Sequence, residues 1–575
     1  MKFLKYLVLL TFALCSVATV TKAQTVAFLA SGSSALFNEL GQAAFTSAST
    51  NTPCLWTQGA ISSIEAQDTR TSPVTNETGS IWVTWGPGTG TCAAPAGSYN
   101  IYAYLSLDSV LGDRCYFETD SAGVAGCVLS MTIAAGTAGA NKICYPQPTS
   151  SCTEYLDNAA IPAAVIGALN GQHIFVAGTD IRPEDAKFAS TRMFTACGTP
   201  LYRQPFDQGL REVYGLGYQT GTTGVGTPVS SYYSSATFHV LDFNITGNDP
   251  ITAQPVPSYT VSTVGAQPII IAVSGPNITA AKDINGFTFT LFVQGVLGRT
   301  TDLIGPTTTA PVTTLIREPL SGTYNTTEYS IPNSSQFHGS QDDNNCNGNV
   351  AYSNPMNLQS TNGVYPAFRR RVIGTGQMVA EIQALGPAGT DTLGYFFWSQ
   401  GNAAAFTDSN GRYLTVNGVD PLQTPSAYVT PGVFDGIIPG SDASHPISNV
   451  TFAGLNAGDY PAWSALRLVS KSPTPAGVTN LIAAVQTLDS TQHDFVTLAN
   501  LKVWHSHYYL PVIGSQVSAN GATLNPATPN DLCNPAAGAI AEFGGDAGGA
   551  NLLKQANVDF CSDFNNIDGL INKAN

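Results

Sequence analysis

The stretch Thr314–Tyr329, which reads TLIREPLSGTYNTTEY, constrains the fold of this chain more than any other part. A short apolar run ends in Arg317, and the chain restarts at Ser321, Gly322 and Thr323 ahead of a predicted helix. The first backbone N–H groups of a helix have no partner within it, and a Ser or Thr at its start caps it. Free N–H groups, two hydroxyls and a guanidinium so close in sequence predict a receptor for a tetrahedral oxyanion. The alternative interpretation is an ordinary capped helix with a surface arginine.

This stretch resembles the R-x-D-x-S-G-T segment of bacterial periplasmic phosphate-binding proteins, the solute receptors of phosphate ABC importers. In register, Arg317 matches the arginine of the family, and Ser321, Gly322 and Thr323 match its S-G-T. Further segments resemble the family's glycine-rich anion loop, its G-A-S-D segment and its G-x-G-N…A-I-G-Y stretch, in that order. They are Ala30–Ser34, Ala177–Asp180, and Gly374–Met378 followed by Thr392–Tyr395.

The resemblance implies a fold and a ligand site. The fold is a two-lobed α/β periplasmic-binding-protein-like fold (type 2) with two crossovers, here enlarged by insertions. The ligand is phosphate or a related tetrahedral oxyanion, held in the cleft between the lobes, without a cofactor and without chemistry on the ligand. The implied contacts are the Ser34 hydroxyl, the Ala35 N–H and the Asp180 acceptor from one lobe, and Arg317, Ser321, Gly322 and Thr323 from the other.

Two departures from the family pattern bear on the ligand. Pro319 stands where the family has an aspartate, with Glu318 beside it. An acidic acceptor favours protonated phosphate over sulfate, which has no proton to donate, so Asp180 becomes the main candidate for that discrimination. At the first loop the Thr-Phe pair of the family reads Ser34-Ala35, which keeps a hydroxyl and an N–H but removes an aromatic wall.

The first 23 residues have the pattern of a cleaved signal peptide. Lys2 and Lys5 precede an apolar run, and the small residues Thr21 and Ala23 suit cleavage before Gln24. No other run is apolar for long enough to cross a bilayer, so a periplasmic or secreted protein that does not span the membrane is expected.

Length and composition narrow the class further. A mature chain of about 550 residues predicts at least two domains. Charged residues make up only 11%, which is typical of an extracellular protein rich in strands and turns. The formal net charge of −15 argues against a nucleic-acid partner. It does not argue against a buried anion site, which depends on local donors.

Eleven cysteines become ten once Cys15 leaves with the signal, so up to five disulfides are expected. No cysteine or histidine spacing typical of zinc occurs among those that precede Asp180. Six cysteines lie between the first loop and Asp180, with a connectivity that spacing leaves open: Cys54, Cys92, Cys115, Cys127, Cys144 and Cys152.

The expected organisation places lobe I at 24–274 and 460–512 and lobe II at 275–459. Lobe I carries a cysteine-rich insertion at about 50–170, with strand-like runs at 81–85, 99–105 and 127–133, and a second expansion at about 201–261. A Gly/Ala-rich tail at 513–575 has Cys533 and Cys561 placed to clamp it.

Continuous apolar runs predict the crossovers. Gln267–Ser274 (QPIIIAVS) is typical of a strand buried on both faces of a parallel sheet, and Tyr460–Ser470 is expected to return to lobe I. Ala280–Phe287 is predicted to be a helix, Thr288–Val293 a strand, and Ala476–Thr487 a helix that closes lobe I.

Other groups of residues in the sequence give weaker evidence for a functional site. Asp343–Gly348 matches the front half of a calcium loop but lacks the glutamate at position twelve, so a polar turn is favoured. His505 and His507 form a strand-end pair rather than a metal site, because no third ligand lies nearby. Arg369–Arg371 could steer anions but is more typical of a solvated face. The tryptophans Trp82, Trp85 and Trp398 are expected in the core.

The sequence therefore predicts an exported, non-enzymatic solute-binding protein for phosphate or a related oxyanion, with an ABC transporter membrane component as the partner that the resemblance implies. A structural or adhesive surface protein that reuses the scaffold is the first alternative, and it predicts a blocked cleft. A secreted phosphohydrolase is the second. It would require a metal cluster or a nucleophile–base pair beside the anion site.

Overall fold

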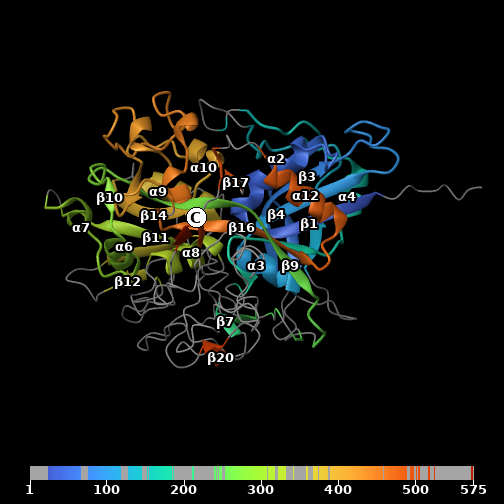
Figure 1. Cartoon of the computed structure of the whole chain (residues 1–575), viewed down its shortest axis with the longest axis horizontal. Coiled ribbons are helices and arrows are strands. Elements are labelled where there is room, and N and C mark those ends of the chain that lie inside the picture. Colours follow the sequence, from blue (N-terminus) through green and yellow to red (C-terminus); the bar gives the residue numbers. More distant parts are fainter. Residues whose placement is uncertain are drawn as a thin grey trace, which may run out of the picture.

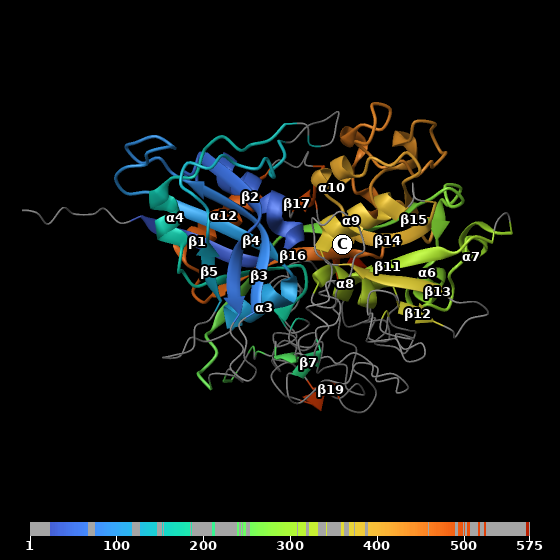
Figure 2. The same cartoon turned by 180° about the vertical axis from the view of Figure 1, so that it is seen from behind.

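Two groups of parallel strands, joined by long antiparallel strands, form the framework of the computed structural model (Figure 1). The two groups correspond to the two lobes implied by the resemblance, and they lie side by side along the long axis (Figure 2). The structure describes residues 24–66, 75–117, 127–145, 152, 154–183, 186, 210–212, 238–240, 243, 245, 247–248, 253–306, 309–317, 321–331, 341, 358–360, 367–372, 374–385, 389–457, 459–488, 493–497, 500, 503–505, 516–517, 523–524 and 571–573.

Lobe I is built around β1 (Thr25–Ser33), the strand predicted before the glycine-rich loop. It pairs in parallel with β4 (Asn100–Leu107) on one side and with β6 (Val176–Thr179) on the other. Phe28, Leu29 and Ala30 of β1 are fully buried, as expected for a central strand with side chains packed on both faces.

The cysteine-rich insertion extends this sheet at its outer edge. Beyond β4 the strand order continues with β3 (Thr75–Trp85), β2 (Cys54–Ala66) and β5 (Val128–Met131), all antiparallel. The run at 99–105, expected within the insertion, is instead a strand of the parallel lobe sheet. Among the described cysteines the disulfides are Cys54–Cys92, Cys115–Cys127 and Cys144–Cys152. The remaining cysteines of the mature chain, including Cys533 and Cys561, lie outside the described residues.

Lobe II is built around β11 (Val312–Arg317), which pairs in parallel with β13 (Ala367–Val372) and β14 (Asp391–Phe397). The short β12 (Leu358–Ser360) completes its edge. A small addition, β10 (Asp283–Ile284) with β15 (Arg412–Val416), joins through β15 to the crossover strand β9 (Tyr259–Ser274).

The crossovers predicted from apolar runs are confirmed. The 16-residue β9 (Tyr259–Ser274) pairs with β14 in lobe II and with β16 (Trp463–Lys471), which pairs in turn with β6 in lobe I. All of these pairings are antiparallel, so the prediction of a parallel environment for β9 is wrong. The apolar run indicates only that both faces of the strand are buried. A strand can be buried on both faces in a parallel or in an antiparallel sheet, so the run does not determine the direction of pairing. A third short strand, β17 (Val496–Thr497), also pairs with β9.

Two neighbouring local predictions are wrong. Ala280–Phe287, predicted as a helix, contains the strand β10 instead and reaches only the first residues of a helix. Thr288–Val293, predicted as a strand, lies in that helix, α6 (Gly286–Val293). The Asn285 side chain accepts a hydrogen bond from the Thr288 N–H at 2.7 Å and so caps the helix. Phe289, Phe292 and Val293 are buried at helical spacing, so the cap and the packing outweigh the β propensity of these residues.

The helices cover the sheet in both lobes, and the predicted closing helix at 476–487 is confirmed as α12. Lobe I has η1 (Ser34–Leu36), α2 (Phe37–Thr46), α3 (Ser109–Phe117), α4 (Ala163–Leu169) and α12 (Ala476–Gln486). Lobe II has α7 (Thr301–Ile304), α8 (Gly322–Ser330), α9 (Gly374–Leu385), α10 (Gln400–Ala405), η5 (Pro425–Ala427), η6 (Ile447–Asn449) and α11 (Ala453–Ala457). Short strand pairs outside this framework are β7 (Leu210–Glu212) with β8 (Phe238–Val240), β18 (Val503–His505) with β21 (Ile571–Lys573), and β19 (Gln516–Val517) with β20 (Thr523–Leu524).

The structure also shows where several weaker sequence features lie. The tryptophans Trp82, Trp85 and Trp398 are buried in the core, as predicted. Arg369 is 1% exposed and donates hydrogen bonds to the backbone oxygens of Val293 and Gln341, so the expectation of a solvated face is wrong for this arginine. The calcium-like loop at 343–348 and the side chains of the histidine pair lie outside the described residues.

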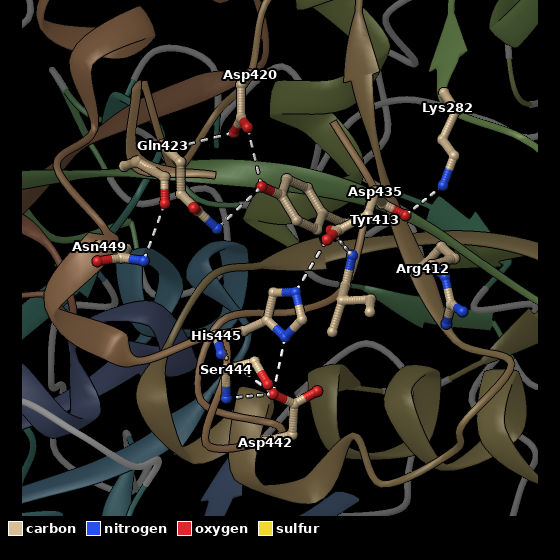
Figure 3. A network of polar contacts seen from close by, with 12 residues as sticks. Lys282, Arg412, Tyr413, Asp420, Gln423, Asp435, Asp442, Ser444, His445 and Asn449 are labelled. Carbon is tan, nitrogen blue, oxygen red and sulfur yellow. Dashed lines mark hydrogen bonds and ion pairs between the residues drawn. The ribbon is translucent and has the colours of Figure 1, made fainter. Parts of the chain in front are cut away.

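A loop segment of lobe II, residues 417–452, is held by its own polar network (Figure 3). His445 bridges two carboxylates, with Nδ1 at 2.8 Å from Asp442 and Nε2 at 2.9 Å from Asp435. Nearby, the Tyr413 hydroxyl donates to Asp420 at 2.9 Å. Burial alone would lower the pKa of His445, but its hydrogen bonds to Asp435 and Asp442 and their charges raise that pKa above its usual value.

Within the part of the chain that the structure describes, no helix combines the length and apolarity that crossing a membrane requires.

Candidate functional site

Parallel strands bring three loops of lobe I to one edge of its sheet. β1, β4 and β6 run in the same direction, so the residues that follow them meet at their carboxyl ends. These residues are Ser34 after β1, Asp108 and Ser109 after β4, and Asp180 after β6.

The first loop is closely packed. Gly32 has φ of +138°, and a Cβ there would lie 1.9 Å from the Gly178 carbonyl oxygen, so only glycine fits. Ser33 then accepts a hydrogen bond from the Ala35 N–H at 3.2 Å. The N–H that the resemblance assigns to the anion is therefore engaged by a neighbouring hydroxyl in this structure. Ser34 is half-buried at the start of η1.

Asp180 is buried where lobe I meets the return crossover. Its carboxylate accepts a hydrogen bond from the Ser109 hydroxyl. Its backbone oxygen accepts from the Ser464 hydroxyl and, at 3.2 Å, from the Arg467 guanidinium, both on β16. Three separated parts of the chain, including lobe II as described below, thus fix this one residue.

The electrostatic environment of Asp180 contains opposing effects. Burial raises the pKa of its carboxyl group, while the hydrogen bond from Ser109 and the positive charges of Arg317 and Arg467 lower it. The balance leaves the pKa above its usual value. The charges that oppose burial come from Arg317 in lobe II and from Arg467 on the crossover strand β16.

Arg317 is the last residue of β11 and is 2% exposed. Its Nη1 donates hydrogen bonds to the hydroxyls of Thr323 at 3.3 Å and Thr375 at 3.0 Å. Its backbone N–H donates to the Tyr395 hydroxyl on β14 at 3.2 Å. Its Nη2 lies 3.7 Å from Asp108 Oδ1, so the ion pair crosses from lobe II to lobe I.

The helix start predicted behind Arg317 is present as α8. Ser321 is its N-cap and accepts a hydrogen bond from the Tyr324 N–H at 3.4 Å. Gly322, the first helical residue, lies directly against the Asp180 carboxylate, and a Cβ on Gly322 would fall 1.5 Å from Asp180 Oδ1. A carboxylate therefore occupies the positive end of the α8 dipole, where anions are stabilised.

The structure thus brings Asp180, Arg317, Ser321, Gly322 and Thr323 into one buried cluster, named the oxyanion cluster below. In both views α3 and α8 lie on the same side of β16 (Figure 1, Figure 2). Ser34 and Ala35 lie at the same edge of the lobe I sheet, but no contact joins them to the lobe II residues within the described part of the chain.

Three contributing residues were missed from the sequence: Asp108, Ser109 and Thr375. Thr375 lies inside a segment that matches the family, and its hydroxyl was a usable signal. Asp108 and Ser109 follow the strand that was assigned to the insertion. The signal for them would have been a polar pair directly after a buried parallel strand.

The described residues contain no group of three His, Cys, Asp or Glu side chains placed to hold a metal ion. Together with Asp108, Ser109 and Thr375, the oxyanion cluster instead combines one buried guanidinium, four hydroxyls, a helix N-terminus and two carboxyl groups. Such a set can bind an anion that also carries a proton, because the guanidinium and hydroxyls donate while a carboxylate accepts.

No protein-family model matches this sequence. A search of curated proteins also gave no match.

Solved structures with a similar arrangement include a phosphate-binding protein from Stenotrophomonas maltophilia, with 13% identity, 72% of this chain and 87% of that chain covered, and a TM-score of 0.30. An ABC-type phosphate transport receptor from Vibrio cholerae has 10% identity over 44% of this chain and 78% of its own, with a TM-score of 0.25. An ancestral soluble variant of the human phosphate-binding protein has 14% identity over 68% and 89%, with a TM-score of 0.28. At these TM-scores no residue role is carried over from them.

Proposed function

We propose that this chain is a solute-binding protein that captures a protonated tetrahedral oxyanion, phosphate first, between its two lobes. The observation that carries the proposal is the buried meeting of Asp180 with Gly322 beside Arg317. It supplies donors from lobe II and an acceptor from lobe I within one small space. Ser34 and the Ala35 N–H are the lobe I donors that become available if Ser33 releases that N–H.

The position of Asp180 explains why an anion suits this place. Its carboxylate lies at the start of α8, a nine-residue helix capped by Ser321. A phosphate oxygen at the same helix terminus would receive free N–H groups and the Arg317 guanidinium. Asp180 would then move aside and accept the phosphate proton. Binding would therefore replace an internal anion with an external one.

Selectivity would follow from that exchange. An unprotonated dianion such as sulfate offers no hydrogen to Asp180, so two negative groups would face each other in a buried site. Asp108, which pairs with Arg317 from lobe I, adds to the same repulsion. Phosphate is thus favoured even though Pro319 removes the acidic residue expected in the arginine loop.

The same contact also supports a second candidate. If Asp180 and Gly322 remain together permanently, the cleft is blocked by the protein's own carboxylate. The chain would then be a structural or adhesive surface protein that reuses the scaffold. Export through the predicted signal peptide and delivery to an ABC transporter are further proposals that rest on the resemblance alone.

Isothermal titration with phosphate and with sulfate tests the proposal. We expect phosphate to bind more tightly, and Arg317→Gln to lower its affinity by about 30- to 150-fold, the effect of losing charged hydrogen bonds worth about 2–3 kcal/mol. Arg412→Gln is the matched control, because Arg412 is an arginine of lobe II whose hydrogen bonds within the described residues go to the nearby backbone oxygens of Ser409 and Gly411. Absence of both heat and thermal stabilisation with either anion would favour the blocked-cleft candidate.

A further inference from the structure

The lobes meet a second time in a buried group of polar side chains, here called the polar seam. It consists of Glu39, Gln42, Gln267, Gln400 and Asp494, each at most 1% exposed. In both views α10 and β17 lie on the opposite side of β16 from α3 and α8 (Figure 1, Figure 2). The polar seam is therefore separate from the oxyanion cluster.

Asp494 is the centre of the polar seam. Its carboxylate accepts hydrogen bonds from Asn38 Nδ2 on α2 and from the Gln400 N–H on α10, each at 2.5 Å. Its backbone oxygen accepts from Gln267 Nε2 on the crossover β9 at 3.2 Å. One residue therefore links lobe I, the crossover and lobe II.

Glu39 packs against the bare backbone of β9 close to Asp494. A Cβ on Gly265 would lie 2.6 Å from Glu39 Oε1 and 2.9 Å from the Val496 backbone oxygen, so glycine makes room for this carboxyl group. Burial and the charge of Asp494 both raise the pKa of Glu39 well above its usual value. Two carboxyl groups are thus enclosed close enough to sense each other.

The polar seam contains more unpaired hydrogen-bond acceptors than unpaired donors. Within the described residues, six buried atoms of four members have no hydrogen-bond partner, and five of them are acceptors. These atoms are Glu39 Oε1 and Oε2, Gln42 Oε1, Gln267 Oε1, and Gln400 Oε1 and Nε2. Buried polar atoms are almost always satisfied, so the excess of acceptors favours a bound group that offers positive charge or donors.

We propose that the polar seam is a binding site for a hard divalent cation of the Ca²⁺ class. Its donors are carboxylate and amide oxygens, the ligands that Ca²⁺ takes six to eight at a time in irregular geometry. No imidazole or thiolate belongs to the polar seam, which disfavours Zn²⁺, and Mg²⁺ keeps several waters that a closed site excludes. With only two carboxyl groups present, the amides of Gln42, Gln267 and Gln400 complete the ligand set.

A cation here would bind three parts of the molecule at once. Glu39 and Gln42 come from α2 in lobe I, Gln267 from the crossover, and Gln400 from α10 in lobe II. It would neutralise Glu39 and Asp494 and so hold the two lobes in the arrangement described above. The polar seam would thereby stabilise this arrangement of the lobes independently of any oxyanion.

Terbium luminescence on the full-length chain in phosphate-free buffer tests the site directly. Trp398 Nε1 donates to the His493 backbone oxygen at 2.7 Å, next to Asp494, so this indole is positioned to excite a bound Tb³⁺. We expect tryptophan-sensitised emission that Ca²⁺ displaces and Mg²⁺ displaces poorly. We also expect Ca²⁺ in about 100-fold excess over its Kd to raise the melting temperature by about 2–4 °C relative to chelator.

Glu39→Gln keeps the shape and removes the charge, and we expect it to lower Ca²⁺ affinity at least about tenfold. Glu154→Gln makes the same chemical change at an exposed position and should leave both readouts unchanged. If Glu39→Gln does not fold, Gln400→Leu replaces it with the same expected loss. The proposal is overturned if wild type shows neither emission nor a melting shift, or if the variant responds like wild type.

Discussion

The two buried junctions between the lobes contain similar residue types but balance their charges in opposite ways. In the oxyanion cluster, Asp108 and Asp180 face the Arg317 guanidinium and a helix N-terminus. In the polar seam, Glu39 and Asp494 are buried with three glutamine amides, and none of these described residues is cationic. The first junction is nearly satisfied by protein groups, whereas the second contains mostly acceptors.

The pKa directions show the same contrast. Burial raises the pKa of both Asp180 and Glu39. For Asp180, Ser109, Arg317 and Arg467 oppose that effect, while for Glu39 the charge of Asp494 adds to it. The burial of Asp180 is therefore partly offset by positive charge from the protein, whereas neither cause that acts on Glu39 offsets its burial. A bound cation would supply the missing positive charge in the polar seam.

The largest expected effect comes from filling the space between the lobes at the oxyanion cluster. In Gly322→Ala the new Cβ would lie 1.5 Å from Asp180 Oδ1, in the space that we propose for the phosphate, so it displaces the carboxylate and leaves no room for the anion. We expect phosphate affinity to fall by more than about 100-fold and the free energy of unfolding to fall by about 1–3 kcal/mol, as in overpacked sites. Titration calorimetry and urea unfolding measure the two effects.

Gly376→Ala is the matched control for that prediction. A Cβ at Gly376, on α9, meets nothing within 4 Å, so the change should alter stability by no more than about 1 kcal/mol. Equal effects of the two substitutions would show that the contact between Asp180 and Gly322 does not control binding.

A smaller effect is expected from removing the charge that lobe I contributes to Arg317. Asp108 lies 3.7 Å from that guanidinium and would repel an incoming dianion. We expect Asp108→Asn to raise sulfate affinity by about tenfold and phosphate affinity by less, because phosphate can share its proton. Asp459→Asn, at an exposed aspartate, should change neither value in titrations of both anions. A loss of affinity for both anions would mean that Asp108 orients Arg317 instead.

Local features of the fold were predictable because they depend on residues close in sequence. The strand ending at Arg317, the Ser321 cap and the helix behind it follow from apolar runs and capping residues, and the structure has each of them. The crossover β9 was visible as a continuous apolar run. The helix α6 was not predicted from the sequence, because its start depends on one capping side chain, that of Asn285.

Features that depend on strand order could not be predicted in the same way. β4 pairs directly with β1, although β2 and β3 lie between them in the sequence. No periodicity in the sequence indicates that pairing partner. Asp108 and Ser109 reach the oxyanion cluster only through this pairing. Glu39 and Asp494 likewise meet only because α2 and the segment before β17 both pack on β9.

The smallest effect is expected where a polar network joins only one lobe. His445 bridges Asp435 and Asp442 within lobe II, and its raised pKa means that its stabilising contribution is complete below the usual value of about 6.5 and is lost as pH rises through the raised value. We expect His445→Gln to lower the free energy of unfolding by about 1–2 kcal/mol at pH 6 and by less at pH 8, measured in urea. Phosphate and Ca²⁺ affinities should not change, because neither junction between the lobes is touched. A variant that lost stability equally at both pH values would show that His445 is neutral in the network, and a change in either affinity would show that this loop is coupled to the lobes.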